Sequence, residues 1–223
     1  MPSLQSSTSR LRAHLAVAGL VSAGSIAIDQ LSKQWAVERL RGTPGLTPIP
    51  GIFELEFSFN PGSAFGLFAA YPNARLAFIA ITLLSLVYMV WLLWRLPTTE
   101  RWTATWGLAL MSGGAIGNLI DRLVRIDVVE LPIYEHIPFW ALIQHPREMA
   151  DALSRGRLRA ELPRHGVVDF LVVHYWPGKR WPTFNVADVC LVVGVGLFLF
   201  YLLRLGRKAG PNAEAPAPFG GGT

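Results

Sequence analysis

Long runs of uncharged, apolar residues recur along the chain and predict transmembrane helices. Leu76–Trp94 and Trp102–Ile120 each contain 19 residues without a charge, and Ala13–Ile28 is also uncharged and mostly apolar. A fourth run, Val189–Leu203, reaches a full span if its helix begins near Asn185. Because a helix needs about 20 predominantly apolar residues to cross a bilayer core, we expect four transmembrane helices, at about residues 13–35, 76–95, 102–122 and 185–205.

The first run has an alternative interpretation as a cleaved signal peptide. Arg10 and Arg12 precede it, and the small residues Ala23 and Ala27 lie near its end, as in a signal peptide. The run ends at Asp29, however, where a polar motif begins, and this favours a retained helix.

Between the apolar runs the pattern changes to that of β-strands. Every second residue from Phe53 to Phe59 is apolar, which is typical of a half-buried strand, and the turn sequence Asn60-Pro61-Gly62 follows. We therefore expect a small extracytoplasmic β unit at about residues 46–66 and a further strand at Val167–Trp176. Residues 209–223 are rich in proline and glycine, and we expect a disordered cytoplasmic tail there.

Composition places the chain among membrane proteins. Of its 223 residues, 52% are apolar and only 16% are charged, against about 25% in an average soluble domain. The net charge of +5 comes from few charges rather than from a basic face, which disfavours a disordered or nucleic-acid-binding chain. The single cysteine excludes an intramolecular disulfide framework, and the five histidines form no metal-binding motif. We expect an integral membrane protein with no metal and no cofactor.

Basic residues near the apolar runs predict the orientation of the chain. If both termini and the connection between the second and third helices lie on one side, that side carries seven basic residues: Arg10, Arg12, Arg95, Arg101, Arg204, Arg207 and Lys208. Two acids, Glu100 and Glu214, accompany them, so the whole net charge of +5 falls on this side. Because cytoplasmic segments carry an excess of Lys and Arg, we expect both termini in the cytoplasm.

Carboxylates at the ends of the apolar runs are the strongest candidates for chemistry. In the expected topology four of them lie at the outer membrane face: Asp29, Asp121, Asp169 and Asp188. Charged groups beside a membrane span are costly and are often functional. The alternative is a structural role in ion pairs, Asp29 with Lys33 and Asp121 with Arg122. The convergence of four carboxylates with Asn60, Asn118 and Asn185 favours a functional site.

Asp169 and Asp188 form the best catalytic pair. Two carboxylates that share a site cannot both ionise easily, so one stays protonated as an acid while the other accepts a proton from water. Such a pair hydrolyses a peptide bond without metal, cysteine or serine. The spacing of Asn185 and Asp188 places both side chains on one helical face. The sequence does not fix which aspartate starts protonated.

Gly113, Gly114 and Gly117 interrupt the third apolar run. They resemble a phosphate-binding loop only superficially. Inside a hydrophobic span, small residues allow close helix packing, and we expect that role for them.

Five segments occur in the order typical of one known family. They are Asp29-Gln30-Leu31-Ser32-Lys33, Asn60-Pro61-Gly62-Ser63-Ala64-Phe65-Gly66, Gly113-Gly114-Ala115-Ile116-Gly117-Asn118-Leu119-Ile120-Asp121-Arg122, Val167-Val168-Asp169-Phe170 and Phe184-Asn185-Val186-Ala187-Asp188. Over about residues 13–205 the chain resembles the lipoprotein signal peptidases, the type II signal peptidases of bacteria. The resemblance implies a single four-helix aspartyl endopeptidase domain in the inner membrane, covering residues 1–208. Such enzymes cleave diacylglyceryl-modified prolipoproteins on the amino side of the lipidated cysteine.

The same resemblance implies roles for individual residues and partners. Asp169 and Asp188 correspond to the catalytic dyad. The residues expected to support the dyad or hold substrate are Asp29, Lys33, Asn60, Gly62, Asn118, Asp121, Arg122 and Asn185. The implied partners are prolipoprotein substrates, membrane lipid and a globomycin-like cyclic peptide inhibitor.

The chain departs from the family pattern in two places. Asn60-Pro61-Gly62-Ser63-Ala64 stands where the family usually has Asn-Thr-Gly-Ala-Ala, a mild change. The larger departure is an extracytoplasmic insertion of about residues 124–164 between the third and fourth helices, with an apolar cluster between Ile137 and Ile143. We weigh two interpretations: an ordered flap that affects substrate entry, and a solvated insertion without catalytic effect.

Two other classes of protein remain as alternatives. A small proton-coupled transporter would use intramembrane carboxylates as a relay, but it would place polar residues in mid-span and often contain an internal repeat, which this sequence lacks. A non-catalytic paralogue that binds lipoproteins is the other alternative. Intact Asp169 and Asp188 argue against it, whereas the insertion leaves it open.

Overall fold

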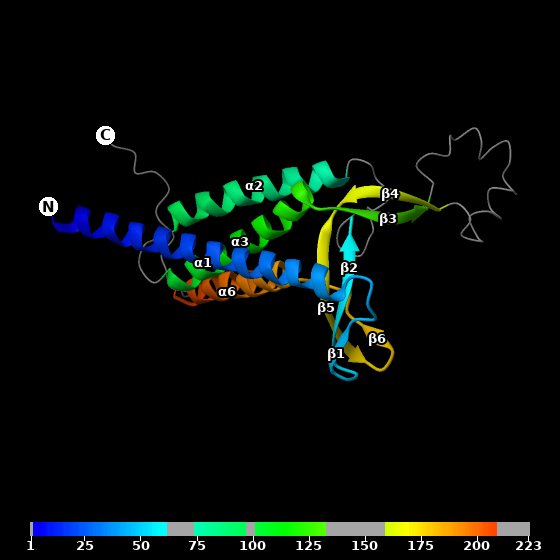
Figure 1. Ribbon diagram of the computed structural model, residues 1–223. Coiled ribbons are helices and arrows are strands. Elements are labelled where there is room, and N and C mark those ends of the chain that lie inside the picture. The colour runs from blue at the N-terminus through cyan, green and yellow to red at the C-terminus, as the bar shows by residue number, and fades with distance from the viewer. Residues whose placement is uncertain (1, 62–73, 97–100, 133–158, 209–223) are drawn as a thin grey trace, which may run out of the picture.

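The computed structural model describes residues 2–61, 74–96, 101–132 and 159–208. Within these ranges the chain forms four long helices and a small set of strands gathered at one end of them (Figure 1). The helices are α1 (Pro2–Leu40), α2 (Ala74–Arg95), α3 (Trp102–Val124) and α6 (Val186–Lys208). The expected mainly helical fold with a small antiparallel sheet is confirmed. Gly62, the apolar cluster after Ile137 and the tail 209–223 lie outside the described residues.

Three of the described helices are long and apolar enough to cross a membrane. They are Thr8–Leu40, Arg75–Arg95 and Val186–Leu205. The fourth, α3, packs against α1, α2 and α6 and contributes many buried small residues, so it is the central helix of the bundle. Its apolar sequence is interrupted by glycines and by the polar residues Asn118, Asp121 and Arg122.

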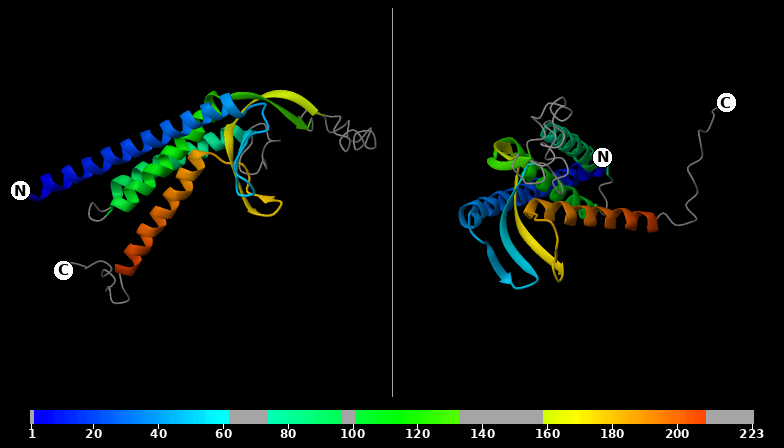
Figure 2. Two further views of the ribbon diagram at one scale, coloured as in Figure 1. Left: turned by 60° about the horizontal axis from the view of Figure 1, so that its bottom comes forward. Right: turned by 90° about the vertical axis from the view of Figure 1, so that its right-hand side faces the viewer.

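Helix α1 is longer than the apolar pattern predicts. The expected span ends near residue 35, whereas the helix continues to Leu40. The additional turns are held by packing, because Ala36 and Leu40 are fully buried against Val168 and Phe170 of the sheet. Helix α1 therefore joins the bundle to the sheet as one continuous rod (Figure 2).

The main sheet has four antiparallel strands in the order β1-β2-β5-β6. The strands are β1 (Leu46–Ile49), β2 (Phe53–Asn60), β5 (Val167–Trp176) and β6 (Lys179–Arg180). The apolar residues Leu55, Phe57 and Phe59 of β2 are covered by other side chains. They pack against the hydrophobic cluster that residues of α1 and β5 form. The pairing of β2 with β5 sets Ser58 opposite Asp169 and Asn60 opposite Val167.

A second, two-stranded sheet occupies the ends of the predicted insertion. Strand β3 (Ile126–Pro132) follows α3 after one residue, and β4 (Arg159–His165) leads through Gly166 into β5. The two strands pair from Ile126 opposite His165 to Pro132 opposite Arg159. The insertion thus begins and ends beside the strand that carries Asp169.

Glycines bring α3 and α6 into close contact. A Cβ on Gly107 would lie 2.8 Å from the Gly194 carbonyl oxygen, and a Cβ on Gly194 would lie 2.7 Å from the Gly107 carbonyl oxygen. Further along, a Cβ on Gly114 would lie 2.4 Å from the Ala187 carbonyl oxygen. The expectation that glycines of the third run allow close packing is confirmed, and α6 is held where its first turn reaches the polar end of α3.

Replacing Gly194 by alanine should therefore destabilise the bundle. The added methyl group has no space between the helices, and overpacking of this kind costs about 1–3 kcal/mol. Gly196→Ala is the matched control, because nothing lies within 4 Å of a Cβ at that position. Thermal unfolding in detergent should show a lower midpoint for Gly194→Ala and an unchanged or higher midpoint for Gly196→Ala. Equal midpoints for the two variants would contradict the close packing.

Candidate active site

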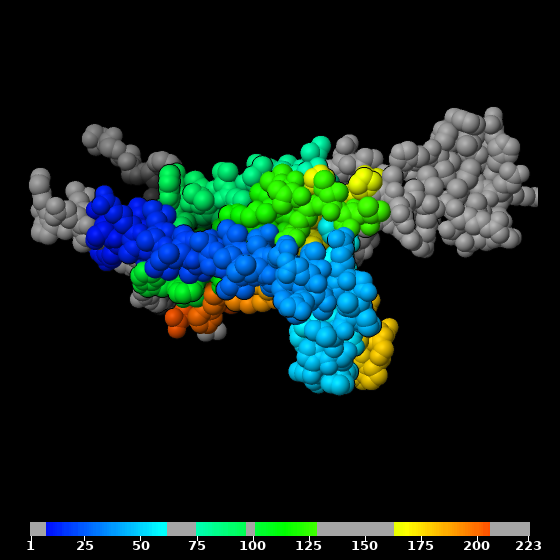
Figure 3. Space-filling view, in the orientation of Figure 1, coloured from blue at the N-terminus to red at the C-terminus, as the bar shows by residue number. Residues whose placement is uncertain are grey.

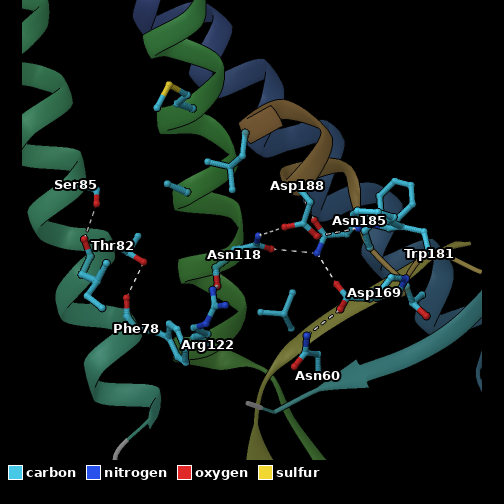
Figure 4. Close-up of a pocket in the computed structure, with 18 of the residues that line it drawn as sticks. Asn60, Phe78, Thr82, Ser85, Asn118, Arg122, Asp169, Trp181, Asn185 and Asp188 are labelled. Atoms are coloured by element: carbon cyan, nitrogen blue, oxygen red, sulfur yellow. Dashed lines mark hydrogen bonds between the residues drawn. The ribbon is translucent and has the colours of Figure 1, made fainter. Parts of the chain in front are cut away.

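The four predicted carboxylates converge at the sheet end of the bundle, although each comes from a different element. Asp29 lies in α1, Asp121 in α3, Asp169 in β5 and Asp188 in the first turn of α6. Asp29 and Asp121 are fully buried, and Asp169 is 5% exposed. Figure 4 shows Asp169 and Asp188 on either side of Asn185, with Asn118 and Asn60 beside them.

Asn185 is the bridge between the two candidate catalytic carboxylates. Its side-chain Nδ2 donates a hydrogen bond of 2.7 Å to Asp169 Oδ1. Its backbone N donates to Asp188 Oδ2 and its Oδ1 accepts from the Asp188 backbone N, both at 3.1 Å. This reciprocal pair is a capping box, which satisfies free N–H groups at a helix start. The same contacts that begin α6 therefore fix Asp188 beside Asp169.

Asn118 has its amide orientation fixed from two sides. Its Oδ1 accepts hydrogen bonds from Lys33 Nζ at 2.9 Å and from Asn185 Nδ2 at 3.2 Å. Two donors on the oxygen leave only the nitrogen to face Asp188, and Asn118 Nδ2 donates to Asp188 Oδ1 at 2.9 Å. Asp188 thus accepts hydrogen bonds on both oxygens.

Lys33 is a fully buried ammonium held between two carboxylates. It lies 2.9 Å from Asp29 Oδ2 and 3.0 Å from Asp121 Oδ2. Both carboxylates also accept hydrogen bonds from the backbone: Asp29 Oδ1 accepts from the Ala187 N at 2.9 Å, and Asp121 Oδ2 accepts from the Val168 N at 3.2 Å. One ion cluster therefore connects α1, α3, α6 and β5.

The ion pair expected between Asp29 and Lys33 is present, but Asp121 pairs differently from the expectation. Its partners are Lys33 and Arg125 Nε, the latter at 2.9 Å from Oδ1. Arg122 instead donates to the Asn118 carbonyl oxygen at 3.1 Å and lies over the Phe78 ring. The reason is helical geometry: Arg125 is four residues from Asp121 and shares its face, whereas the next residue points elsewhere.

Two polar residues of this cluster were missed by the sequence analysis as site residues. Gln30 Nε2 lies 3.1 Å from Asp29 Oδ2, 3.0 Å from Asp121 Oδ1 and 3.1 Å from the Gly117 carbonyl oxygen. The other is Arg125, described above. The i, i+4 spacing from Asp121 to Arg125 was a usable signal, whereas nothing in the sequence indicated where Gln30 points.

A cavity of about 560 Å³ opens between α2, α3, α6 and the sheet. Its polar end contains the side chains of Asn60, Asn118, Arg122, Asp169, Asn185 and Asp188. Its apolar part follows one face of α2 and one of α3, with Phe78, Ile81, Met89 and Met111 among the lining residues. Lys33, Asp29 and Asp121 do not line it and form a buried layer behind Asp169 and Asp188. Gly62 lies outside the described residues.

The environment of Asp169 favours its protonated form. Burial, together with the smaller effect of the negative charge of Asp188, raises the pKa of this carboxyl to about 7. Hydrogen bonds from Asn185 Nδ2 and from Asn60 Nδ2, the latter 3.2 Å long, oppose the rise in pKa. A group with this pKa exchanges a proton near neutral pH, as an acid catalyst must.

Within the described ranges no three His, Cys, Asp or Glu side chains are arranged to hold a metal ion. The candidate chemistry of these residues is carboxylate acid–base chemistry. A cavity with paired carboxylates at its polar end, between apolar helices, is the arrangement expected of a membrane protease of the aspartic type.

Comparisons with known proteins identify the particular family. Residues 21–204 match the family described as signal peptidase (SPase) II, and the chain belongs to this family. A lipoprotein signal peptidase of Symbiobacterium thermophilum is 30% identical over 184 residues, covering 82% of this chain and 92% of its own. One from Geobacter metallireducens is 30% identical over 189 residues, covering 85% and 91%. The chain is therefore a protease that cleaves signal peptides from prolipoproteins.

The fold agrees with solved structures of bacterial membrane enzymes. One, at 2.3 Å resolution, superposes with a TM-score of 0.61 and 20% identity, over 88% of this chain and 93% of its own. A second, at 1.9 Å resolution, has a TM-score of 0.56 and covers 85% and 94%. At this identity the likeness supports the fold alone.

Removing the ammonium of Lys33 should destabilise the protein strongly. In Lys33→Met, two buried carboxylates lose their shared counter-ion, and breaking a buried pair costs about 3–5 kcal/mol. Arg41→Met is the matched control, because the Arg41–Asp127 pair is half exposed and such pairs contribute about 1 kcal/mol or less. Thermal unfolding in detergent measures both. A midpoint for Lys33→Met as high as that of Arg41→Met would show that the buried cluster is not structural.

Proposed function

We propose that Asp169 and Asp188 are the catalytic dyad of a prolipoprotein signal peptidase that acts at the outer face of the bacterial inner membrane. Its substrates are diacylglyceryl-modified prolipoproteins, cleaved on the amino side of the lipidated cysteine. The observation that carries the proposal is the pairing of Asp169 with Asp188 through Asn185 at the polar end of an apolar cavity. Membrane lipid and a globomycin-like inhibitor are further proposed partners.

The different environments of the two carboxylates assign their roles. Asp188 accepts from Asn118 Nδ2 and from the Asn185 backbone N at the start of α6. Both oxygens of Asp188 therefore accept hydrogen bonds, and we assign Asp188 the role of the base. Asp169 has a pKa near 7 and carries the proton.

Hydrolysis then follows in two steps. Ionised Asp188 accepts a proton from the attacking water while Asp169 donates a hydrogen bond to the scissile carbonyl oxygen, which becomes the oxyanion of a tetrahedral intermediate. The C–N bond of the intermediate then breaks as Asp188 gives the proton it took from water to the leaving amine, which returns Asp188 to its starting form. Arg122 lines the same cavity and adds a positive charge near the developing oxyanion.

The orientation of the bundle is part of the proposal. With the termini in the cytoplasm, α3 is the fourth span and residues 1–208 form one membrane domain with its sheet outside. The excess of basic residues at the opposite end of the helices from the sheet supports this orientation. The dyad then lies at the membrane boundary, where the cysteine of a translocated prolipoprotein is found.

A gel-shift cleavage assay tests the dyad. The purified protein in detergent is given a diacylglyceryl-modified prolipoprotein, alongside Asp169→Asn, Asp188→Asn and a tube with globomycin. We expect cleavage by the unmodified protein only, and both variants should stay folded because asparagine keeps the size of aspartate. An aspartate whose replacement leaves near wild-type rates is not part of the dyad. No cleavage from folded protein across several substrates would favour the non-catalytic paralogue.

The raised pKa of Asp169 predicts how the rate depends on pH. Catalysis needs its protonated form, so turnover should fall as the pH rises through about 7. The Asn60 amide stabilises the ionised form, so Asn60→Ala should raise the pKa of Asp169 and move the alkaline limb to higher pH.

Ser85→Ala is the matched control for this pH profile. Ser85 lines the same cavity, but its hydroxyl donates to the Ile81 carbonyl oxygen of its own helix at 2.8 Å. The alkaline limb of the pH profile of Ser85→Ala should coincide with that of the unmodified protein. If the alkaline limb stays in place in Asn60→Ala, or shifts equally in both variants, Asp169 is not the catalytic acid.

A further inference from the structure

A second cavity, of about 370 Å³, lies directly beside the catalytic one. The two share three lining residues, Trp181, Phe184 and Asp188, which therefore stand between them. The other lining residues of the second cavity are Val173, Tyr175, Val189, Val192 and Val193. Asp188 supplies the only charge among these described residues. We call this cavity the valine groove.

The walls of the valine groove come from the outer face of α6 and from β5. Val189, Val192 and Val193 have the i, i+3, i+4 spacing of one helical face, immediately after Asp188, and all three are exposed, Val192 by 73%. The groove therefore starts at a proposed catalytic carboxylate and runs about 6 Å along a helix that is apolar enough to span a membrane.

We propose that the valine groove binds an acyl chain of the lipidated substrate cysteine while the signal peptide lies in the larger cavity. This inference rests on the proposed function. The cysteine that carries the lipid donates the amine of the scissile bond, so its thioether leaves the substrate within one residue of the dyad. The signal peptide and the lipid must then separate at Asp188, and the two cavities diverge from that residue.

The shapes and chemistry of the two cavities assign the two occupants. The larger cavity has amide and guanidinium groups that can hydrogen-bond a peptide backbone, supplied by Asn60, Asn118 and Arg122. The valine groove has an apolar lining beyond Asp188, which suits an unbranched hydrocarbon and offers a peptide backbone little to bond. An acyl chain in lipid is already out of water, so the groove contributes packing and orientation rather than hydrophobic transfer.

The test compares two substrates that differ only in acyl length. A dipalmitoylglyceryl prolipoprotein and its dioctanoylglyceryl analogue are cleaved by the unmodified protein and by Val192→Trp, whose indole fills the groove. We expect the unmodified protein to favour the long chain in kcat/KM, and Val192→Trp to lower the long-chain value by about fivefold, which corresponds to roughly 0.9 kcal/mol. The short-chain value should stay nearly unchanged.

Val195→Trp is the matched control, because Val195 is an exposed valine of the same helix that does not line the groove. It should keep the long-chain preference. Val193→Trp fills the groove from a neighbouring position and should act like Val192→Trp, which covers the case in which one variant fails to fold. Equal losses of kcat/KM on both substrates, or the same loss in Val195→Trp, would show that the valine groove does not bind an acyl chain. Cleavage of neither substrate by the unmodified protein would instead refute the proposed function.

Discussion

The structure depends on one buried ammonium group. Lys33 is fully buried between Asp29 and Asp121, and taking three charges out of water costs several kcal/mol per ion unless each is paired and hydrogen-bonded. The pairing is complete because the carboxylates also hold the Ala187 and Val168 backbone N–H groups. Those two residues directly precede Asp188 and Asp169 in sequence. The ion cluster therefore sets the backbone positions of both proposed catalytic residues without touching the cavity.

The same ammonium group reaches Asp188 through an amide. Lys33 donates to Asn118 Oδ1, so the Asn118 nitrogen faces Asp188 and donates to its Oδ1. Asp169, by contrast, lies on a buried strand next to a negative charge, and both effects favour its protonated form. Two chemically identical side chains thus have different surroundings, because Asp188 lies in the first turn of a helix and Asp169 lies within a sheet.

The sequence predicted what depends on composition and spacing. The apolar runs predicted the helices, the alternation after Phe53 predicted β2, and the carboxylates at the run ends predicted the cluster. What depends on long-range packing was not predictable. Asn60 meets Asp169 only because β2 pairs with β5 in one register, and the pairing needs Gly166, where a Cβ would lie 2.6 Å from the Asn60 carbonyl oxygen. The extension of α1 to Leu40 likewise follows from its contact with the sheet.

The chain between α3 and β5 begins and ends at one point. The chain leaves the active-site region at Arg125, whose carbonyl oxygen accepts from the Gly166 N at 3.3 Å where the chain returns. Arg125 itself is held by Asp121, and the base of β3 is held by an ion pair between Asp127 and Arg41. Beyond this closure the β3–β4 ladder extends away from the helices (Figure 1), and its described base lies on the other side of the molecule from the projecting β1 and β2 (Figure 3). The ends of this connection are thus fixed independently of its length, because the described contacts of Asp169 are with β2 and Asn185 rather than with β3 or β4. The connection between α3 and α6 can therefore lengthen without moving Asp169 or Asp188.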